Sequence, residues 1–206
     1  MIHPDEQPDA ELLRRMRAGD EAAFRSIYRR CHGGIYRYSL HMTGNASIAD
    51  DVTQETFMVL IQEADRFDPA RGQLSAFLFG VGRNLLSRRL EKERAFVPYP
   101  EQEASNHSGH KANGHSERLI SLPTDLVRNE TIGRVRKAVL SLPANYREIV
   151  VLCDLQELSY EEAAGVLECA VGTVRSRLHR ARALLVDKLR EFRAAPQRVV
   201  AGGPAK

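Results

Sequence analysis

The chain has 206 residues, a net charge of only +3 and a sequence pI near 8.9. Hydrophobic residues make up 43% of it and aromatic residues 6%, with no Trp, which is sufficient for one large or two small packed domains. Such a small charge excess does not by itself indicate a nucleic-acid partner. Its distribution is more informative, because residues 83–94 carry five Lys or Arg against two acids and residues 171–193 carry seven against two.

Several classes of protein are disfavoured by what the sequence lacks. Cys31, Cys153 and Cys169 have no CxxC spacing, so we expect buried free thiols in a reducing compartment. The N-terminal segment lacks the apolar core of a signal peptide, and no apolar run approaches the roughly 20 residues that cross a bilayer. We therefore expect a soluble, cytoplasmic protein with no direct membrane insertion. The absence of a Gly-rich phosphate loop, a catalytic triad and metal-ligand spacing predicts no enzyme activity, no cofactor, no metal site and no small-molecule substrate.

The first half of the chain shows helical periodicity and no strand-like alternation. Asp9 is placed to cap a short helix that ends at Gly19, and Asp20 to cap the next helix. Gly33-Gly34 predicts a local bend in that second helix, and Thr43-Gly44-Asn45 predicts its end. The second helix is long and amphipathic, because apolar side chains recur at spacings of three and four: Phe24, Ile27, Cys31, Ile35, Tyr38 and Met42.

Two further helices follow in this half. Ser47 is expected to open the third, with Asp50 at capping-box spacing. The breaker-rich loop 68–72 precedes a fourth helix over residues 74–94. The third helix has an apolar stripe and a second, mainly polar face; the stripe comprises Ile48, Val52, Val59, Leu60 and Phe67, and the face comprises Asp51, Gln54, Glu55, Met58 and Gln62. The fourth helix is expected to bury Leu74, Phe77, Leu78, Val81 and Leu85.

Composition changes at residues 96–125, which are rich in Pro, Ser, Asn, Gly and His and show no helical period. We expect a flexible linker there, and not a metal site, because its histidines (His107, His110 and His115) have no cysteine partners and no organising helix. Four helical patterns then occupy residues 126–193, and residues 1–8 and 194–206 read as a flexible lead and a disordered tail. The predicted fold is all-α, with two small helical domains, 9–95 and 126–193, joined by a flexible linker, the second containing a helix-turn-helix.

The helix-turn-helix is predicted between Ser159 and Leu185. Ser159 and Glu162 have capping-box spacing, and a break at residues 168–170 separates two helical patterns. The second pattern places Val174, Leu178, Ala181 and Leu185 on one face and keeps Arg175, Arg177, Arg180 and Arg182 off it. A basic second helix after a tight turn favours DNA binding. An αα-hairpin with a solvated basic face is the alternative.

Three segments together resemble one family. They are ASIADDVTQETFMVLIQEADRF (46–67), GQLSAFLFGVGRNLLSRRLEKER (72–94) and LSLPANYREIVVLCDLQELSYEEAAGVLECAVGTVRSRLHRARALL (140–185). In order and spacing they resemble the bacterial RNA polymerase sigma factors of the extracytoplasmic-function (ECF) group. The resemblance implies a promoter-specific initiation factor for stress-responsive transcription, with core RNA polymerase and promoter DNA as partners and an anti-sigma factor as its regulator. It also implies two polymerase contacts, on the clamp coiled coil of the largest subunit and on the flap of the second largest.

The resemblance assigns the first polymerase contact to the third helix. Asp51, Gln54 and Glu55 match the acidic-amide motif of the family's polymerase-binding segment, and Met58 adds an adaptable apolar contact. An acidic and amide face suits a basic partner helix. Without the resemblance, the same residues would be read as a face that merely keeps an exposed helix soluble.

The fourth helix and the loop before it match the segment that opens and reads the minus-ten promoter element. The candidate residues are Arg71, Arg83, Asn84, Arg88 and Arg89, with the loop Asp68 to Gln73 shaping a pocket for an extruded base. Arginines can follow phosphates, and Asn84 is the counterpart of the family's base-proximal Asn. Phe77 stands where the family often has Trp, and we expect it to pack in the core.

The second domain would read the minus-thirty-five element as duplex, with its recognition helix beginning near Val171. The candidate contacts are Thr173, Arg175, Ser176, His179 and Arg180, which can meet base edges or phosphates. Arg177 and Arg182 are alternatives for intramolecular ion pairs. The turn departs from the family pattern at Glu168, where Gly is common, and at Ala170, where a polar cap is common; each departure costs roughly 1 kcal/mol.

Two competing functions remain open at this point. A stand-alone helix-turn-helix regulator accounts for residues 126–193 but not for the acidic helix or the first basic stretch. An adaptor that mimics a sigma factor and sequesters a regulator would not need its DNA-facing arginines. A nuclease is disfavoured because no acidic metal cluster is visible.

Overall fold

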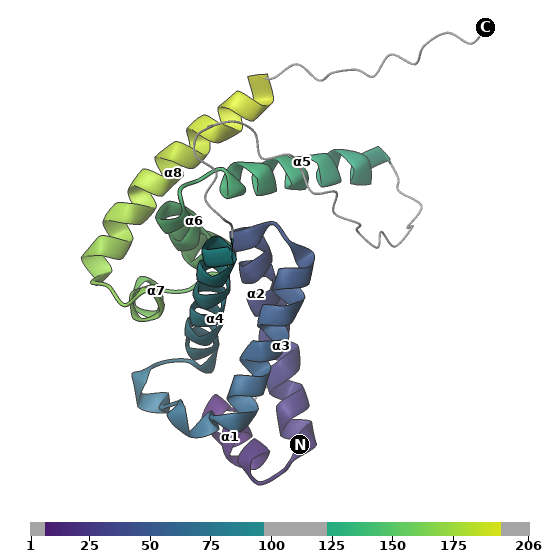
Figure 1. Cartoon of the computed structure of the whole chain (residues 1–206), viewed down its shortest axis with the longest axis vertical. Helices are drawn as coiled ribbons and strands as arrows, with labels where there is room; N and C mark the ends of the chain where they lie inside the picture. The colour runs from purple at the N-terminus through teal and green to yellow at the C-terminus, as the bar shows by residue number, and fades with distance from the viewer. Residues whose placement is uncertain (1–6, 97–122, 195–206) are drawn as a thin grey trace, which may run out of the picture.

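The computed structural model describes residues 7–96 and 123–194, which form eight α-helices and, within these two stretches, no β-strand (Figure 1). The predicted all-α fold with four helices in each half is confirmed. The first half holds α1 Asp9–Arg17, α2 Glu21–Thr43, α3 Ala46–Gln62 and α4 Leu74–Phe96, and the second holds α5 Pro123–Leu140, α6 Ala144–Val150, α7 Tyr160–Leu167 and α8 Val171–Ala194. Residues 97–122 of the expected linker, with its three histidines, lie outside the described residues, as do most of the lead and almost all of the tail. The other expected linker residues are helical: Phe96 ends α4, and residues 123–125 begin α5, so the second half starts earlier than expected.

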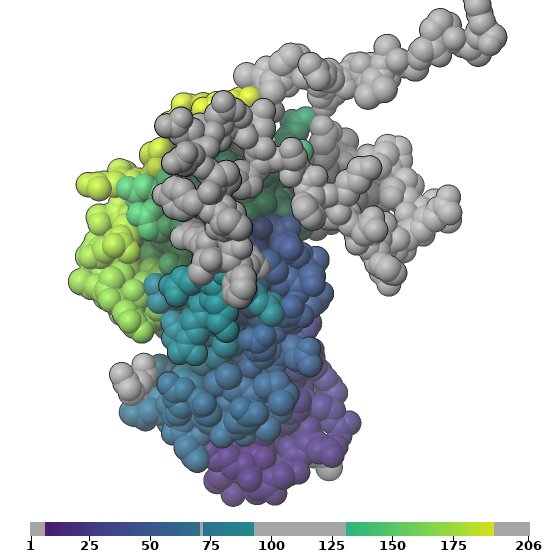
Figure 2. All heavy atoms as spheres, in the orientation of Figure 1, coloured from purple at the N-terminus to yellow at the C-terminus, as the bar shows by residue number. Residues whose placement is uncertain are grey.

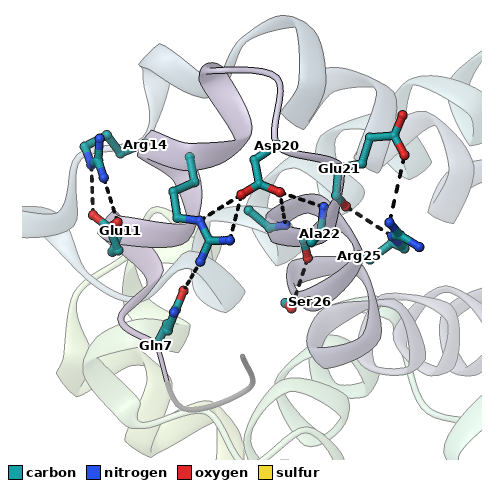
Figure 3. Close-up of polar contacts among 10 residues, drawn as sticks. Gln7, Glu11, Arg14, Asp20, Glu21, Ala22, Arg25 and Ser26 are labelled. Atoms are coloured by element: carbon teal, nitrogen blue, oxygen red, sulfur yellow. Dashed lines mark hydrogen bonds and ion pairs between the residues drawn. The ribbon is translucent and has the colours of Figure 1, made fainter. Parts of the chain in front are cut away.

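The start of α2 is fixed as predicted, whereas the role expected for Asp9 is wrong. The Asp20 carboxylate accepts hydrogen bonds from the backbone N–H groups of Ala22 and Ala23, at 2.9 and 3.3 Å (Figure 3). Helix α1 follows Pro8 and has no side-chain cap. The carboxylate of Asp9 instead accepts a hydrogen bond from the backbone N–H of Leu74, at 3.2 Å, where α4 begins. A side chain of α1 therefore caps a helix 65 residues further along the chain.

The junction between α2 and α3 shows a second difference. Gly44 adopts a left-handed conformation (φ 71°) and ends α2, as the stop signal predicts. The cap of α3 is Asn45, whose side chain accepts from the N–H groups of Ser47 and Ile48, so the expectation that Ser47 opens this helix is wrong. Both residue types cap well, and Asn45 comes first after a glycine that has already ended the previous helix.

Helix α2 continues through Gly33 and Gly34. A Cβ atom at Gly34 would lie 3.3 Å from the ring of Phe79, which belongs to α4. Glycine is present here because α2 and α4 approach closely, and this approach is a tertiary requirement that the sequence pattern does not reveal.

Helices α2, α3 and α4 form the bundle of the first half, with α1 packed against α2. Its core is filled by side chains that include Leu12, Ile27, Tyr38, Leu60, Leu74 and Leu78. Leu86 of α4 is buried and belongs to this core. Three residues that were expected to be buried in α4 are only half-buried: Phe77, Val81 and Leu85. In the second half α8 packs against α5, α6 and α7, and a π-helical turn, Val151–Leu155, extends α6.

The two halves pack directly against each other. Helix α4 contacts α7, and α2 contacts α5, α6 and the π-helical turn. In Figure 2 the surface of the first helices, coloured purple to teal, adjoins that of the last helices, coloured green to yellow. Buried side chains from both halves belong to one contiguous hydrophobic cluster.

Candidate functional site

The face of α3 that carries the predicted polymerase-binding residues is exposed. All four lie at the surface, and Met58 is 47% exposed. The opposite face buries Ala49, Val52, Thr53, Thr56, Phe57 and Leu60. The structure therefore brings these four residues together on one accessible side of one helix.

Ile61 extends this face, although the sequence pattern did not single it out. It is 51% exposed, more than any other large hydrophobic residue in the described part of the chain, and it follows Met58 by three positions. Residues three apart on a helix are neighbours, so the two side chains form an apolar strip beside the acids. The spacing to Met58 was the signal that could have identified it.

The acids of α3 are engaged by an arginine of α4. Arg89 donates to the carboxylates of Asp51, at 2.9 Å, and Glu55, at 3.4 Å. All three side chains are at least 30% exposed, so solvent screens the pair. A residue predicted to contact minus-ten DNA thus lies between the two predicted surfaces.

The remaining minus-ten candidates of α4 are distributed around the helix. Arg83 points to the second half of the molecule, where its Nε donates to Glu148 at 3.0 Å. Arg88 is exposed and makes no hydrogen bond or ion pair with the residues that the structure describes. Arg71 lies in the 3-10 turn Pro69–Arg71, and its side chain falls outside the described part. The described arginines of α4 therefore have different surroundings: Arg83 pairs with Glu148 of α6, Arg89 pairs with Asp51 of α3, and Arg88 is exposed.

Asn84 lines a cleft of about 560 Å³ between α4 and α7. The loop that was expected to shape a base pocket supplies Asp68, Gly72 and Gln73 to its wall. Phe77 also lines the cleft and meets Phe67 edge-on, with ring centroids 5.7 Å apart. Phe77 is half-buried against the core, so it both packs and borders the cleft. The opposite wall consists of α7 residues: Glu161, Glu162, Gly165 and Val166.

The predicted helix-turn-helix is confirmed as α7, a turn and α8. Ser159 and Glu162 form the complete capping box, with backbone-to-side-chain distances of 2.8 and 3.1 Å. Glu168 ends α7 in the left-handed conformation (φ 53°, ψ 44°), and the carbonyl of Ala170 accepts the first bonds of α8. Val174, Leu178 and Ala181 are buried, and Leu185 is half-buried, as the predicted inner face requires.

The candidate duplex contacts lie mostly on the open side of α8. Arg175, Ser176, His179 and Arg180 are exposed, and Thr173 is half-buried near the start of the helix. The hydroxyl of Ser176 donates to the carbonyl of Thr173. The guanidinium of Arg175 also lies over the ring of Tyr160, 5.8 Å from its centroid, which orients it.

Arg182 forms an intramolecular ion pair, which was one of the two roles considered for it. It donates twice to the carboxylate of Asp154, at 2.6 and 3.1 Å, and joins α8 to the π-helical turn. The hydrogen bond to Asp154 raises the pKa of Arg182. Arg182 is therefore committed to the fold of the second half and is a weaker DNA candidate than its neighbours.

The cysteines are free and partly covered. Burial raises the pKa of the Cys31 and Cys153 thiols to about 11, so both remain protonated and unreactive near neutral pH. The residues described by the structure contain no group of three or more His, Cys, Asp or Glu side chains suited to a metal ion. Among those same residues, no helix combines the length and apolar character needed to cross a membrane.

Comparisons with known proteins agree with this arrangement. The family model "Sigma-70 region 2" matches residues 27–96, and "Sigma-70, region 4" matches residues 132–185. The chain is 31% identical over 181 residues to the ECF RNA polymerase sigma factor SigW of Bacillus subtilis, covering 87% of this chain and 96% of that protein. It is 30% identical over 185 residues to the ECF RNA polymerase sigma-E factor of Escherichia coli K12, covering 88% and 94%.

A solved structure shares the fold. CnrH, in complex with the cytosolic domain of CnrY, superimposes with a TM-score of 0.64 at 26% sequence identity, covering 89% of this chain and 97% of that one. The similarity to SigW and to sigma-E extends over nearly the whole length of both proteins. The chain belongs to the ECF RNA polymerase sigma factors.

Proposed function

We propose that this sigma factor docks on core RNA polymerase through α3 and directs it to promoters that both halves of the chain read. The observation that carries the proposal is the exposed face of α3, where Asp51, Gln54, Glu55 and Met58 lie together opposite the buried face. Acid, amide and thioether groups suit the clamp coiled coil of the largest polymerase subunit, a basic helical partner. Ile61 adds apolar contact to this face.

The DNA contacts are divided between α4 and α8. Residues 9–95 would open and read the minus-ten element through Arg71, Arg83, Asn84, Arg88 and Arg89, and residues 126–193 would read the minus-thirty-five duplex. The exposed row Arg175, Ser176, His179 and Arg180, together with Thr173, supports the second assignment. Residues 96–125 would link the two domains, and the second would also touch the flap of the second-largest subunit.

The proposed role as a sigma factor also implies how the chain is regulated and where in the cell it acts. CnrH was solved bound to the cytosolic domain of CnrY, which supports control of this chain by an anti-sigma factor. A protein that works on core polymerase acts in the cytoplasm, and it supplies binding surfaces without catalysing a reaction or holding a cofactor.

The test uses core polymerase and purified chain. Asp51→Lys combined with Gln54→Ala should weaken polymerase binding at least tenfold, or about 1.4 kcal/mol, because it reverses a charge and removes an amide at the contact. Asp65→Lys is the matched control, since Asp65 is 93% exposed in the same half of the chain but lies outside α3. Run-off transcription across genomic fragments then identifies the promoter. Equal polymerase affinity in the double variant and the control would refute the docking assignment.

A further inference from the structure

We infer that Tyr160 is a positioning residue for Arg175, and that this pair directs the guanidinium to a phosphate of the promoter duplex and not to a base edge. Nothing in the sequence pattern singled out Tyr160. The inference deepens the proposed function and rests on it in one respect, because it takes the helix-turn-helix as the part of the chain that binds the minus-thirty-five duplex.

The two side chains meet across the helix-turn-helix. Tyr160 is the first residue of α7, and Arg175 lies near the start of α8. Cζ of Arg175 stands over the ring of Tyr160, 5.8 Å from its centroid. A cation over an aromatic face within about 6 Å of the centroid is attracted by the ring. The contact therefore joins the recognition helix to the helix that precedes it.

The ring is the fixed partner in this contact. Tyr160 is half-buried and packs against the hydrophobic core, whereas Arg175 is exposed. The capping box of Ser159 and Glu162 fixes the start of α7 on both sides of the tyrosine. A long arginine side chain loses conformational freedom when it binds a ligand, and holding it in place beforehand reduces that cost.

Stacking leaves the binding groups of Arg175 available. The contact uses the flat face of the guanidinium, so the N–H donors in its plane stay free to form paired hydrogen bonds with two phosphate oxygens. Arg175 makes no hydrogen bond or ion pair with the residues that the structure describes, although Glu161 and Glu162 follow Tyr160 in the chain. Glu162 instead accepts from the backbone N–H of Ser159. A neutral ring thus holds Arg175 without neutralising its charge.

The direction in which Arg175 is held favours a phosphate. In a helix-turn-helix the second helix lies in the major groove, and the first crosses the DNA backbone. Arg175 is turned toward the first residue of α7, so its donors are presented at the edge of the groove, where the phosphates lie. Arg180 is exposed and has no ring contact within the described residues, and Arg182 is bound to Asp154. Among these three arginines, Arg175 is the one held toward the backbone.

The experiment is a double-mutant cycle in the holoenzyme. Core polymerase is reconstituted with wild type, Tyr160→Phe, Tyr160→Leu, Arg175→Ala, or Tyr160→Leu combined with Arg175→Ala. Tyr160→Phe keeps the ring and removes the hydroxyl, whereas Tyr160→Leu removes the ring and keeps an apolar side chain. Tyr160→Leu combined with Arg180→Ala is the matched control, because Arg180 does not contact the ring. Fluorescence anisotropy measures binding to a promoter fragment that carries the upstream element.

A second set of fragments identifies the DNA group that Arg175 meets. In each fragment one phosphate of the upstream element is replaced by an uncharged methylphosphonate, or one base pair is changed. A phosphate contact of Arg175 is recognised by one methylphosphonate position that weakens the wild-type holoenzyme but not the Arg175→Ala holoenzyme. Base-pair changes should weaken both holoenzymes to the same degree.

The expected affinity is about fivefold lower for Tyr160→Leu and unchanged for Tyr160→Phe. Tyr160→Leu should add nothing to Arg175→Ala and should have its full effect beside Arg180→Ala. The same loss for Tyr160→Leu with and without Arg175 overturns the inference, because the ring would then act through the fold alone. Equal losses for Tyr160→Phe and Tyr160→Leu also overturn it, since the hydroxyl would then be the group that matters.

Two further outcomes separate the inference from the proposed function. If Arg175→Ala is insensitive to one base-pair change and to no methylphosphonate, Arg175 reads a base, and the phosphate assignment is wrong while the promoter contact stands. If Arg175→Ala binds every fragment like wild type, its place at the duplex is rejected, and the inference is rejected with it. A loss of affinity for Arg175→Ala without coupling to Tyr160 rejects the inference alone.

Discussion

Arg89 of α4 lies 2.9 Å from the carboxylate of Asp51 on α3, so a residue expected at promoter DNA is paired with a residue expected at polymerase. The same guanidinium reaches Glu55, at 3.4 Å. A basic polymerase helix that approaches these acids competes with Arg89 for them. If α3 docks on polymerase and α4 binds DNA as proposed, Arg89 links the two events, because it would be freed when polymerase takes its acids.

Arg89→Ala is therefore expected to affect promoter opening much more than folding. The pair is substantially exposed, so its loss should lower the free energy of unfolding by less than about 1 kcal/mol. Chemical denaturation measures the stability, and permanganate footprinting of the holoenzyme on its promoter measures strand opening. Arg14→Ala is the control, since Arg14 forms a similarly exposed pair with Glu11 on α1. A loss of more than about 2 kcal/mol for Arg89→Ala alone would assign it a structural role.

The exposed arginines of α8 are expected to govern the salt dependence of duplex binding. Replacing Arg175 or Arg180 by Ala should flatten the plot of log affinity against log salt by about 0.9 if each neutralises one phosphate. Transcription should fall only at promoters that have an upstream element. Arg190→Ala serves as the control, because Arg190 is 78% exposed near the other end of α8, beside Asp187. An unchanged slope in both variants would place neither residue at DNA.

A substitution at Ala170, in the turn of the helix-turn-helix, is expected to stabilise the fold. Ala170 precedes α8 and offers only its backbone carbonyl, so Ala170→Ser adds a side-chain cap and should raise the free energy of unfolding by about 1 kcal/mol. Ser159→Ala, which removes the existing capping box of α7, should lower it by a similar amount. Thermal denaturation of both variants provides the comparison. If the two changes had the same sign, helix capping would not be what limits this motif.

Stability is expected to decrease on acidification because of His41. Burial, followed by the positive charges of Arg136 and Arg37, lowers the pKa of His41 below its usual value of 6.5. The unfolded chain then binds a proton near pH 6.5 that the folded chain does not, so the contribution is present above that pH and is lost as the pH falls below it. Denaturation midpoints across this range should decrease for wild type and change less for His41→Gln. An equal decrease in both proteins would exclude His41 as the cause.

Local signals in the sequence were sufficient for the helix-turn-helix and for the exposed face of α3. The capping box at Ser159 and the inner face of α8 depend on residues a few positions apart, and the chain places them as that spacing demands. The errors at Asp9 and at Ser47 have different origins. At α3 two polar residues could act as the cap and Asn45 does. At α1 no side chain caps the helix, because the Asp9 carboxylate is engaged by the distant backbone N–H of Leu74.

Contacts between distant residues could not be predicted in this way. The sequence did not reveal the hydrogen bonds of Glu148, because its partners Tyr38 and Arg83 lie 110 and 65 positions away. The distribution of the α4 arginines over different neighbours also depends on how the two halves pack. Periodicity indicates which side of a helix is apolar, whereas tertiary packing decides which polar residues remain available to a partner.

The hydrogen bond from the first backbone N–H of α4 to Asp9 means that α1 helps to fix the start of α4. Helix α1 braces the end of α4 that follows the loop Asp68 to Gln73, and an ion pair of Asp9 with Arg30 of α2, at 3.3 Å, anchors the brace. Removing α1 would leave that end of α4 without this hydrogen bond, so α1 is expected to help hold the loop Asp68 to Gln73 in place.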